Sequence, residues 1–166
     1  MMIPRLRVAL ALMALLAGAA LGIALASEYW GGLVPCPLCL VERWPYRIMI
    51  ALGLVGLILP RALARTALAL GVLAALAGAA ASFVHVGVEQ KWWPSPMPEC
   101  IAPNLTGLSM AERLARMPAI PSKSCEDPSY FIDALPISIS LMNMLYALAL
   151  AAGFATFLWT TRKDPP

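Results

Sequence analysis

Charged residues are scarce in this chain of 166 amino acids. They make up 13% of the sequence, whereas hydrophobic residues make up 61%. A soluble domain is typically about one quarter charged. The composition therefore excludes an ordinary soluble domain and indicates a membrane protein. Histidine is also scarce, since His85 is the only one, and this limits any metal site that depends on imidazole ligands.

Acidic residues are absent from four apolar runs, at residues 8–26, 48–59, 66–84 and 137–160. The second run is too short to cross about 30 Å of hydrocarbon at about 1.5 Å per residue, so its helix must begin earlier, near Cys39 and Leu40. The sequence thus predicts an all-α fold, a polytopic membrane four-helix bundle that forms a single domain over residues 1–166. The expected spans are about 8–26, 40–59, 66–84 and 137–160. We expect the spans to hold no acidic residue and therefore expect no proton path through the membrane.

The charges between the runs orient the chain. One side carries six basic residues and one acid: Arg5, Arg7, Arg61, Arg65, Arg162, Lys163 and Asp164. The segment from His85 to Leu135 carries four basic and six acidic residues. The positive-inside rule then places both termini in the cytoplasm. The loops at about 27–39 and 85–136 face outward, into the periplasm if the membrane is a bacterial inner membrane.

The first run also fits a cleavable signal peptide. Two arginines precede it, and the sequence ALAS at Ala24–Ser27 supplies small residues of the kind found at a cleavage site. The run is longer than the usual signal core of about 7–15 residues, which favours a retained span. Cleavage would leave the orientation of the downstream chain unchanged.

All four cysteines lie in the outward segments or at their edge. Disulfides persist on that side of a bacterial inner membrane. A bridge between Cys100 and Cys125 would be either a structural staple or, because its surroundings are rich in proline and short polar residues, an exposed and labile bond open to attack. Cys36 and Cys39 form a C-x-x-C motif, a spacing used by redox dithiols and by zinc sites. Zinc would need two further ligands that the spacing does not offer, so we expect no metal.

The residues after Cys39 favour a reactive sulfur. If the second span begins near Cys39, this sulfur lies at a helix N-terminus, where unpaired N–H groups stabilise an anion. Arg43 and Arg47 follow four and eight residues later, on the same helix face. This predicts a stabilised thiolate at the membrane boundary. The alternative is that the arginines extend to the lipid headgroups, which we favour for Arg47 but not for Arg43.

The second outward loop contains one segment with a helical pattern, Leu108–Met117. Ser109 and Glu112 have the spacing of a capping box, and the methionines and leucine after Ser109 fall on one face. A short helix on the membrane surface and a plain loop helix both fit this pattern.

The sequence PCPLCLVER at the head of the second span, followed by PSPMPEC and a fourth cysteine, resembles the bacterial disulfide bond formation protein B (DsbB) family. The resemblance covers span number, orientation, cysteine order and the C-x-x-C-x-x-E/Q-R run. The vitamin K epoxide reductase family is a weaker match, because its loop cysteines precede the C-x-x-C motif.

The resemblance implies a thiol:quinone oxidoreductase that reoxidises a DsbA-like periplasmic thiol oxidase. Cys100 would be attacked by that partner, with Cys125 as its bonded mate. Cys36 would exchange with Cys125, and Cys39 would contact a membrane quinone, either ubiquinone or menaquinone. Arg43 would support the Cys39 thiolate and the charge that develops on the quinone. Protons for the quinone would come from the outer boundary.

The resemblance leaves several nearby residues with two interpretations. His85 is either a quinone-binding or proton-donating residue, or an interfacial histidine that is satisfied by its surroundings. Trp44 and Tyr46 either wall the quinone pocket or belong to the interfacial aromatic belt, which we favour. Glu89 and Gln90 either serve the quinone in the same way as His85 or occupy a solvated loop face, which we favour. Surface anchors are expected for Trp92 and Trp93. Asn143 and Tyr146 either form interhelical hydrogen bonds, which we favour, or contact the quinone.

A different class of function is a membrane scaffold whose disulfides only hold its outer loops. The expected partners are membrane lipid, the quinone and the thiol oxidase, and not nucleic acid.

Overall fold

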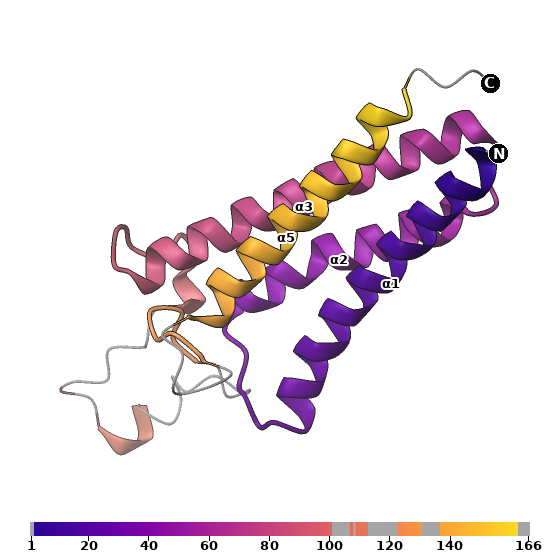
Figure 1. The fold of residues 1–166 in the computed structure, drawn as a ribbon. Coiled ribbons are helices and arrows are strands. Elements are labelled where there is room, and N and C mark those ends of the chain that lie inside the picture. The colour runs from indigo at the N-terminus through magenta and orange to yellow at the C-terminus, as the bar shows by residue number, and fades with distance from the viewer. Residues whose placement is uncertain (1, 101–106, 108, 113–122, 131–136, 163–166) are drawn as a thin grey trace.

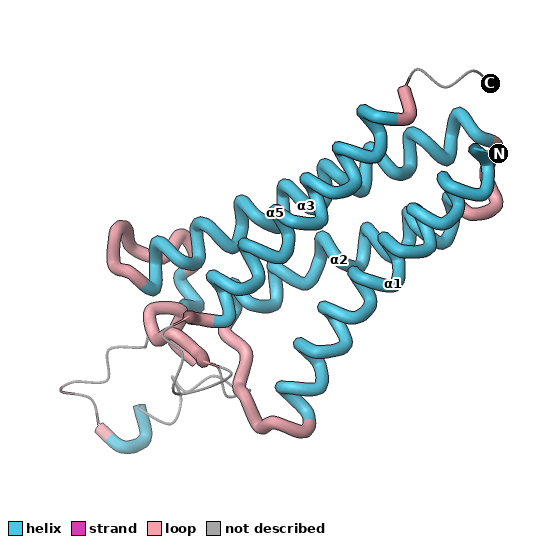
Figure 2. Tube along the Cα trace, viewed as in Figure 1, coloured by secondary structure: helices cyan, strands magenta, loops and turns pink. Residues whose placement is uncertain are grey.

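The computed structural model describes residues 2–100, 107, 109–112, 123–130 and 137–162. These residues form helices and connecting loops and contain no strand (Figure 2). The main elements are α1 (Met2–Tyr29), α2 (Pro37–Gly56), α3 (Arg61–Glu89), the short 3-10 helix η1 (Pro98–Cys100) and α5 (Ile139–Thr160). The all-α prediction is therefore confirmed for the described part of the chain.

Three helices of the described chain are long and apolar enough to cross a membrane: Pro4–Tyr29, Arg61–Glu89 and Ile139–Thr160. The helix α2 is not among them. It begins and ends close to the predicted second span but carries Glu42, Arg43 and Arg47. The prediction of a membrane protein thus stands on three helices. The expectation of acid-free spans is wrong for α2, because the turns added to lengthen its apolar run include a glutamate.

The long helices pack in sequence order, α1 on α2, α2 on α3 and α3 on α5 (Figure 1). Small residues allow close approach where they cross. A Cβ atom at Gly53 of α2 would lie 2.8 Å from the carbonyl oxygen of Leu10 in α1, so only glycine fits there. Pro45 lies inside α2 and faces Gly78 of α3, where an added Cβ would lie 3.2 Å from the proline ring.

Helix α1 contributes to the core of the described chain. Leu10 and Met13 are fully buried and belong to a cluster that includes Met49 of α2 and Leu68 of α3. Loss of this helix would expose those side chains, which favours a retained first span over a cleaved signal peptide.

Both ends of the described chain lie at the same end of the molecule, together with the link between α2 and α3 (Figure 1). The cysteine-bearing segments lie at the opposite end. This arrangement agrees with the relative placement that the charge pattern predicts for the termini and the loops.

The capping box of the second loop is present. Glu112 accepts hydrogen bonds from the Ser109 hydroxyl at 2.7 Å and from its backbone N–H at 2.9 Å, and residues 110–112 are helical. The remainder of the predicted helix Leu108–Met117 lies outside the described residues.

Candidate functional site

The start of α2 is fixed by its own sequence. Pro37 occupies the first helical position, where its missing N–H costs nothing. Cys36 is the N-cap, and its sulfur accepts a hydrogen bond from the backbone N–H of Cys39 at 3.1 Å. Cys39 therefore lies in the first helical turn, as expected. The helix terminus, however, directs an N–H group at the sulfur of Cys36 rather than at that of Cys39.

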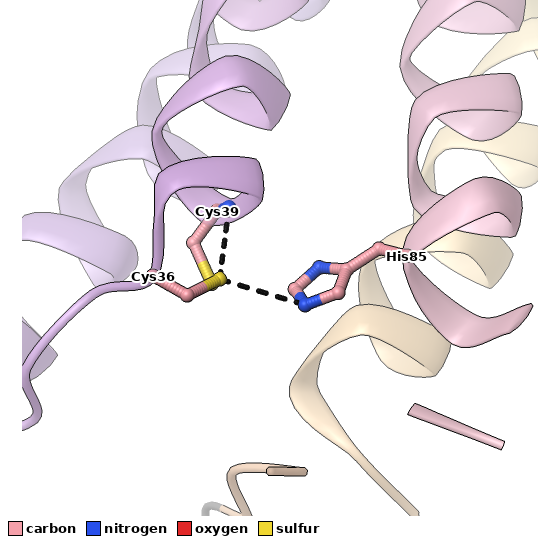
Figure 3. A group of neighbouring side chains, drawn as sticks. All are labelled: Cys36, Cys39 and His85. Atoms are coloured by element: carbon pink, nitrogen blue, oxygen red, sulfur yellow. Dashed lines mark hydrogen bonds between the residues drawn. A yellow bond between two sulfur atoms is a disulfide. The ribbon is translucent and has the colours of Figure 1, made fainter. Parts of the chain in front are cut away.

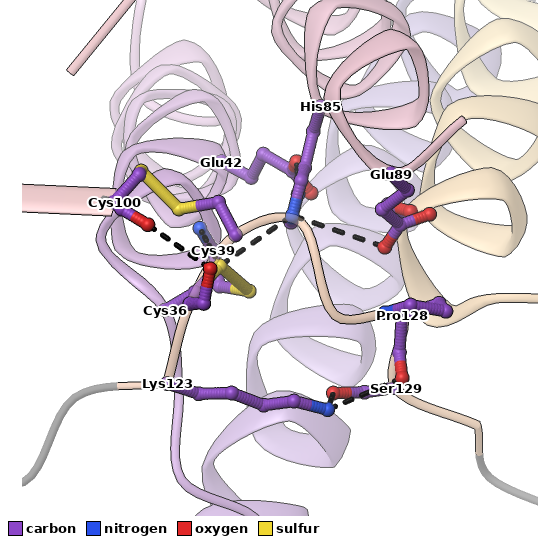
Figure 4. Close-up of a disulfide and its surroundings, with 12 residues drawn as sticks. Cys36, Cys39, Glu42, His85, Glu89, Cys100, Lys123, Pro128 and Ser129 are labelled. Carbon is purple, nitrogen blue, oxygen red and sulfur yellow. Dashed lines mark hydrogen bonds and ion pairs between the residues drawn. A yellow bond between two sulfur atoms is a disulfide. The ribbon is translucent and has the colours of Figure 1, made fainter. Parts of the chain in front are cut away.

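The four cysteines form two disulfides, Cys36–Cys39 and Cys100–Cys125, and none is free. Figure 4 shows the two bridges close together. Three of the sulfur-bearing residues share one buried cluster with Leu38 and Val88: Cys36, Cys100 and Cys125, which are 3%, 0% and 0% exposed.

The prediction of an exposed second bridge is wrong in this state. Cys100 and Cys125 are docked on the N-terminal end of α2 and on Val88 of α3. Trp93 packs on the same cluster and donates its indole N–H to the carbonyl oxygen of Val84 at 3.1 Å. A Cβ atom at Gly87 would overlap the Trp93 ring, so glycine makes room for it. Local composition could not reveal a burial that depends on distant partners.

The neighbouring residues Trp92 and Trp93 differ in their exposure. Trp92 is 60% exposed, which suits the surface position expected for it. Trp93 is half-buried against the disulfide cluster, so its main contacts are with protein.

His85 reaches from α3 to the α2 disulfide (Figure 3). It is 3% exposed, its Nε2 atom lies 3.5 Å from the sulfur of Cys36, and its Nδ1 atom lies 2.7 Å from Oε1 of Glu42. The sequence predicts a histidine at the outer end of the third span, but the contact with Cys36 spans 49 positions and comes from the fold.

Glu42 is buried and fully paired. Its second oxygen accepts a hydrogen bond from the side-chain amide of Asn143 at 2.7 Å. The same amide donates to Ser82, and Asn143 accepts from the Tyr46 hydroxyl at 2.5 Å. Asn143 therefore joins α2, α3 and α5, as expected of an interhelical hydrogen-bonding residue. Tyr146 also fits that expectation, since its hydroxyl donates to the carbonyl oxygen of Leu16.

Glu89 differs from its predicted solvated position. It is 9% exposed, and one carboxylate oxygen lies 3.8 Å from Nε2 of His85. Its other oxygen has no hydrogen-bond partner among the described residues. The helix α3 continues to Glu89 and so carries this carboxylate to the site, whereas Gln90 is exposed.

The two arginines of α2 have separate surroundings. Arg43 is buried and forms an ion pair with Glu28 of α1 at 2.7 Å. Arg47 is exposed, and its guanidinium lies 5.1 Å from the centre of the Trp44 ring. Trp44 is 59% exposed, in agreement with the aromatic-belt interpretation, whereas Tyr46 is buried.

A cavity of about 320 Å³ lies beside the α2 disulfide. It is bounded by the C-terminal half of α1, residues 33–35, the first turns of α2, the C-terminal turns of α3, the N-terminal turns of α5 and residues on both sides of Cys125. Cys36, Cys39, Arg43, Glu42, His85 and Glu89 line it, together with apolar side chains of α1 and α5. The predicted residues Cys36, Cys39, Arg43 and His85 thus meet at one cavity, whereas Cys100 and Cys125 lie next to it.

Glu42 and Glu28 were not predicted as site residues. A signal for Glu42 was present, since an acid within a membrane helix is a functional candidate by default. Glu28 could not be found in this way, because it pairs with Arg43 only through the crossing of two helices.

The sulfurs of Cys36 and Cys39 and a ring nitrogen of His85 lie within 4.8 Å of one another. The two sulfurs are bonded to each other, so in this state neither is available as a thiolate ligand for a metal.

The comparisons with known proteins agree with the presence of two disulfides at this site. The model of the family "Disulfide bond formation protein DsbB" matches residues 6–157. The chain is also similar to "Uncharacterized protein RP370" of Rickettsia prowazekii (strain Madrid E), with 31% identity over 146 residues that cover 87% of this chain and 83% of that protein. No solved structure matches. The chain belongs to the DsbB family, a family of disulfide-forming oxidoreductases.

Proposed function

We propose that this member of the DsbB family is a protein-dithiol:quinone oxidoreductase of the bacterial inner membrane. It reoxidises a DsbA-like periplasmic thiol oxidase and passes two electrons through its two cysteine pairs to ubiquinone or menaquinone. The observation that carries the proposal is the placement of both disulfides side by side at one end of the helices, with a cavity next to one of them.

The contact between the disulfides supports a relay. Thiol–disulfide exchange requires a thiolate to approach a sulfur of the next bridge. Cys36 belongs to the same buried cluster as Cys100 and Cys125, so exchange between Cys125 and Cys36 needs little movement. Cys100 would receive the attack of the partner. Because Cys100 is fully buried, the partner must first displace the second loop from α2.

The cavity supports a quinone as the electron acceptor. Its volume lies at the lower end of the range for small-molecule sites, about 300–1,000 Å³. The wall from α1 is largely apolar, α5 adds both apolar and polar side chains, and the opposite side carries Cys39, Arg43 and His85. When bound, the quinone accepts two electrons and two protons. Cys39 would lie against its ring, Arg43 would stabilise the negative charge that develops on its oxygens, and His85 would bound the ring on the α3 side.

The membrane arrangement in this proposal has α2 as a fourth span and both termini in the cytoplasm. The basic residues near the termini support this orientation. The buried polar residues of α2 would then face Glu28, His85 and Asn143 of the neighbouring helices instead of lipid.

Trapping of the partner tests the proposal. Cys125→Ala leaves Cys100 without its bonded mate, so a mixed disulfide between Cys100 and a periplasmic thiol oxidase should accumulate in cells. The matched control is Cys100→Ala, which should form no such complex. Absence of a Cys100-linked complex in the first variant would contradict the relay.

Blocked respiration separates this proposal from a membrane scaffold with structural disulfides. A relay that has lost its oxidised quinone should accumulate free thiols at all four cysteines. A scaffold should keep both bridges. Alkylation of intact cells followed by mass spectrometry distinguishes the two results.

A further inference from the structure

A sulfur, an imidazole and a carboxylate lie in a row between α2 and α3. The sulfur of Cys36 is 3.5 Å from Nε2 of His85, and Nδ1 of the same ring is 2.7 Å from Glu42. All three residues are buried, with exposed fractions of 3%, 3% and 7%. A nucleophile, a base and a group that orients the base, each within contact distance of the next, is the arrangement that activates thiols and hydroxyls in many enzymes.

The partners of Glu42 decide which ring nitrogen carries the proton. An ionised carboxylate only accepts hydrogen bonds. Glu42 therefore accepts from Nδ1–H of His85 on one oxygen and from the amide of Asn143 on the other. With the proton on Nδ1, the neutral ring presents the lone pair of Nε2 to the sulfur of Cys36.

The N-terminus of α2 also favours a thiolate at Cys36. The backbone N–H of Cys39 points at the sulfur of Cys36 at 3.1 Å and would stabilise a thiolate there. Cys36 thus has both a base for its proton and a donor for its negative charge.

We propose that His85 is the general base of Cys36 and that Glu42 is the positioning residue that holds its tautomer. This inference rests on the proposed function. In the reduced pair, the S–H bond of Cys36 breaks, Nε2 of His85 takes the proton, and the electron pair stays on sulfur. The thiolate then forms the S–S bond with Cys39 as the S–H bond of Cys39 breaks, and the two electrons released pass to the quinone.

The whole oxidation balances. Two S–H bonds break and one S–S bond forms, and two electrons and two protons pass to the quinone. His85 releases its proton to the cavity that it lines, where one of the new O–H bonds is made. In the resting state both ring nitrogens already have protein neighbours, which favours a role at sulfur over a direct hydrogen bond to the quinone.

Other charged groups face the same space and must be considered in any pH profile. In the part of the chain that the structure describes, the other charged groups around the site are Arg43 of α2 with its partner Glu28 of α1, Glu89 of α3, and Lys123 and Asp127 of the second loop. Glu89 is the one that also approaches Nε2 of His85, at 3.8 Å.

The test is the pH dependence of Cys36 alkylation, which needs no quinone. The variant Cys39→Ser/Cys100→Ala/Cys125→Ala keeps Cys36 as its one thiol, and iodoacetamide is the probe. An ordinary cysteine thiol has a pKa of about 8.5. The midpoint of the alkylation profile should lie below that value. His85→Gln in this background should raise the midpoint and slow alkylation at pH 7 about tenfold, the change that about one pH unit produces.

Further variants make the result specific. Glu42→Gln should shift the Cys36 profile in the same direction but less. The variant Cys36→Ser/Cys100→Ala/Cys125→Ala isolates Cys39, whose profile should not respond to His85→Gln. Circular dichroism confirms that each variant is folded, and His85→Asn replaces His85→Gln if the latter is not.

An unchanged Cys36 midpoint in a folded His85 variant would overturn the inference. So would a shift caused by Glu89→Gln and not by His85→Gln, because Glu89 would then be the base. Neither result touches the proposed function, which fails separately if no partner is trapped through Cys100.

Discussion

The two disulfides of this protein are chemically alike but have different surroundings. Cys36–Cys39 joins residues within the first turn of α2 and faces a cavity, a histidine and two buried carboxylates. Cys100–Cys125 joins residues 25 positions apart and is covered by Trp93, Val88 and Leu38. The nearest polar contacts at the second bridge are to backbone, since Cys125 and Ser124 both donate to the carbonyl oxygen of Cys100.

This difference assigns separate tasks to the two pairs. Polar and titratable neighbours can stabilise a thiolate or move a proton, and they surround the first pair. Apolar packing can only cover or uncover a bond, and it surrounds the second pair. We therefore expect chemistry at the α2 pair to depend on charge, and chemistry at the loop pair to depend on access.

The largest expected effect is loss of the α2 pair. Cys39→Ser should lower quinone reduction by the purified protein about a thousandfold or more, because no dithiol remains next to the cavity. The lone Cys36 thiol should exchange with Cys125, so part of the protein should carry a Cys36–Cys125 bridge and a free Cys100. Quinol formation and disulfide mapping by mass spectrometry measure the two effects. A Cys100–Cys125 bridge that stays intact in every molecule would contradict exchange between Cys36 and Cys125.

The next effect separates the two arginines of α2. Arg43→Leu should lower kcat about a hundredfold, because in the proposed function the guanidinium that lines the cavity would stabilise the negative charge that develops on the quinone. Arg47→Leu is the matched control, since Arg47 is exposed and stacks on Trp44, and its kcat should change by less than about twofold. Steady-state kinetics with a soluble quinone measures both. Equal effects would contradict the assignment of Arg43 to the site.

A smaller effect should appear at the loop pair. Trp93→Ala removes part of the cover of Cys100–Cys125 and should weaken its docking by about 1–2 kcal/mol, which raises the undocked population about 5–30-fold. The rate at which a soluble dithiol reduces this bridge should rise in proportion. Trp92→Ala is the control, because Trp92 is 60% exposed. Timed alkylation measures the rates, and identical behaviour of the two variants would mean that Trp93 does not control access.

The smallest effect is expected at the capping box of Ser109 and Glu112, which do not line the cavity. Hydrogen bonds from the Ser109 side chain and then from its backbone N–H lower the pKa of Glu112. The capping contribution is therefore complete above the ordinary carboxyl range and is lost as the pH falls through the lowered folded-state pKa. An NMR titration of the Glu112 side chain in detergent should follow this change, and Ser109→Ala should return the pKa to its ordinary range. The variant should not alter the alkylation of Cys36 at pH 7.

The sequence was a good guide to features that depend on local pattern. Apolar runs predicted four helices, and they appear at α1, α2, α3 and α5 within a few residues of the expected bounds. The C-x-x-C motif and a second span that begins near Cys39 predicted a dithiol at a helix N-terminus. Ser109 and Glu112 predicted their own hydrogen bonds. In each case the partners lie within a few residues of one another, so the chain geometry alone brings them together.

Contacts between residues far apart in the sequence could not be predicted from local pattern. The burial of Cys100 and Cys125 depends on Trp93, for which Gly87 makes room. The site around Glu42 requires α2, α3 and α5 to meet at Asn143, which lies 101 positions away. Glu89 was expected in solvent because its helix was predicted to end five residues earlier, at Val84.

By itself, the sequence determined that the chain is helical, that much of it is suited to a membrane and that its cysteines lie toward one end. These properties follow from composition and from spacing along a helix. Only the tertiary structure decided which sulfur faces the histidine, which arginine is held at the cavity and which bridge is covered. Those outcomes depend on how helices cross, and a crossing brings together residues whose separation in sequence carries no information about their distance in space.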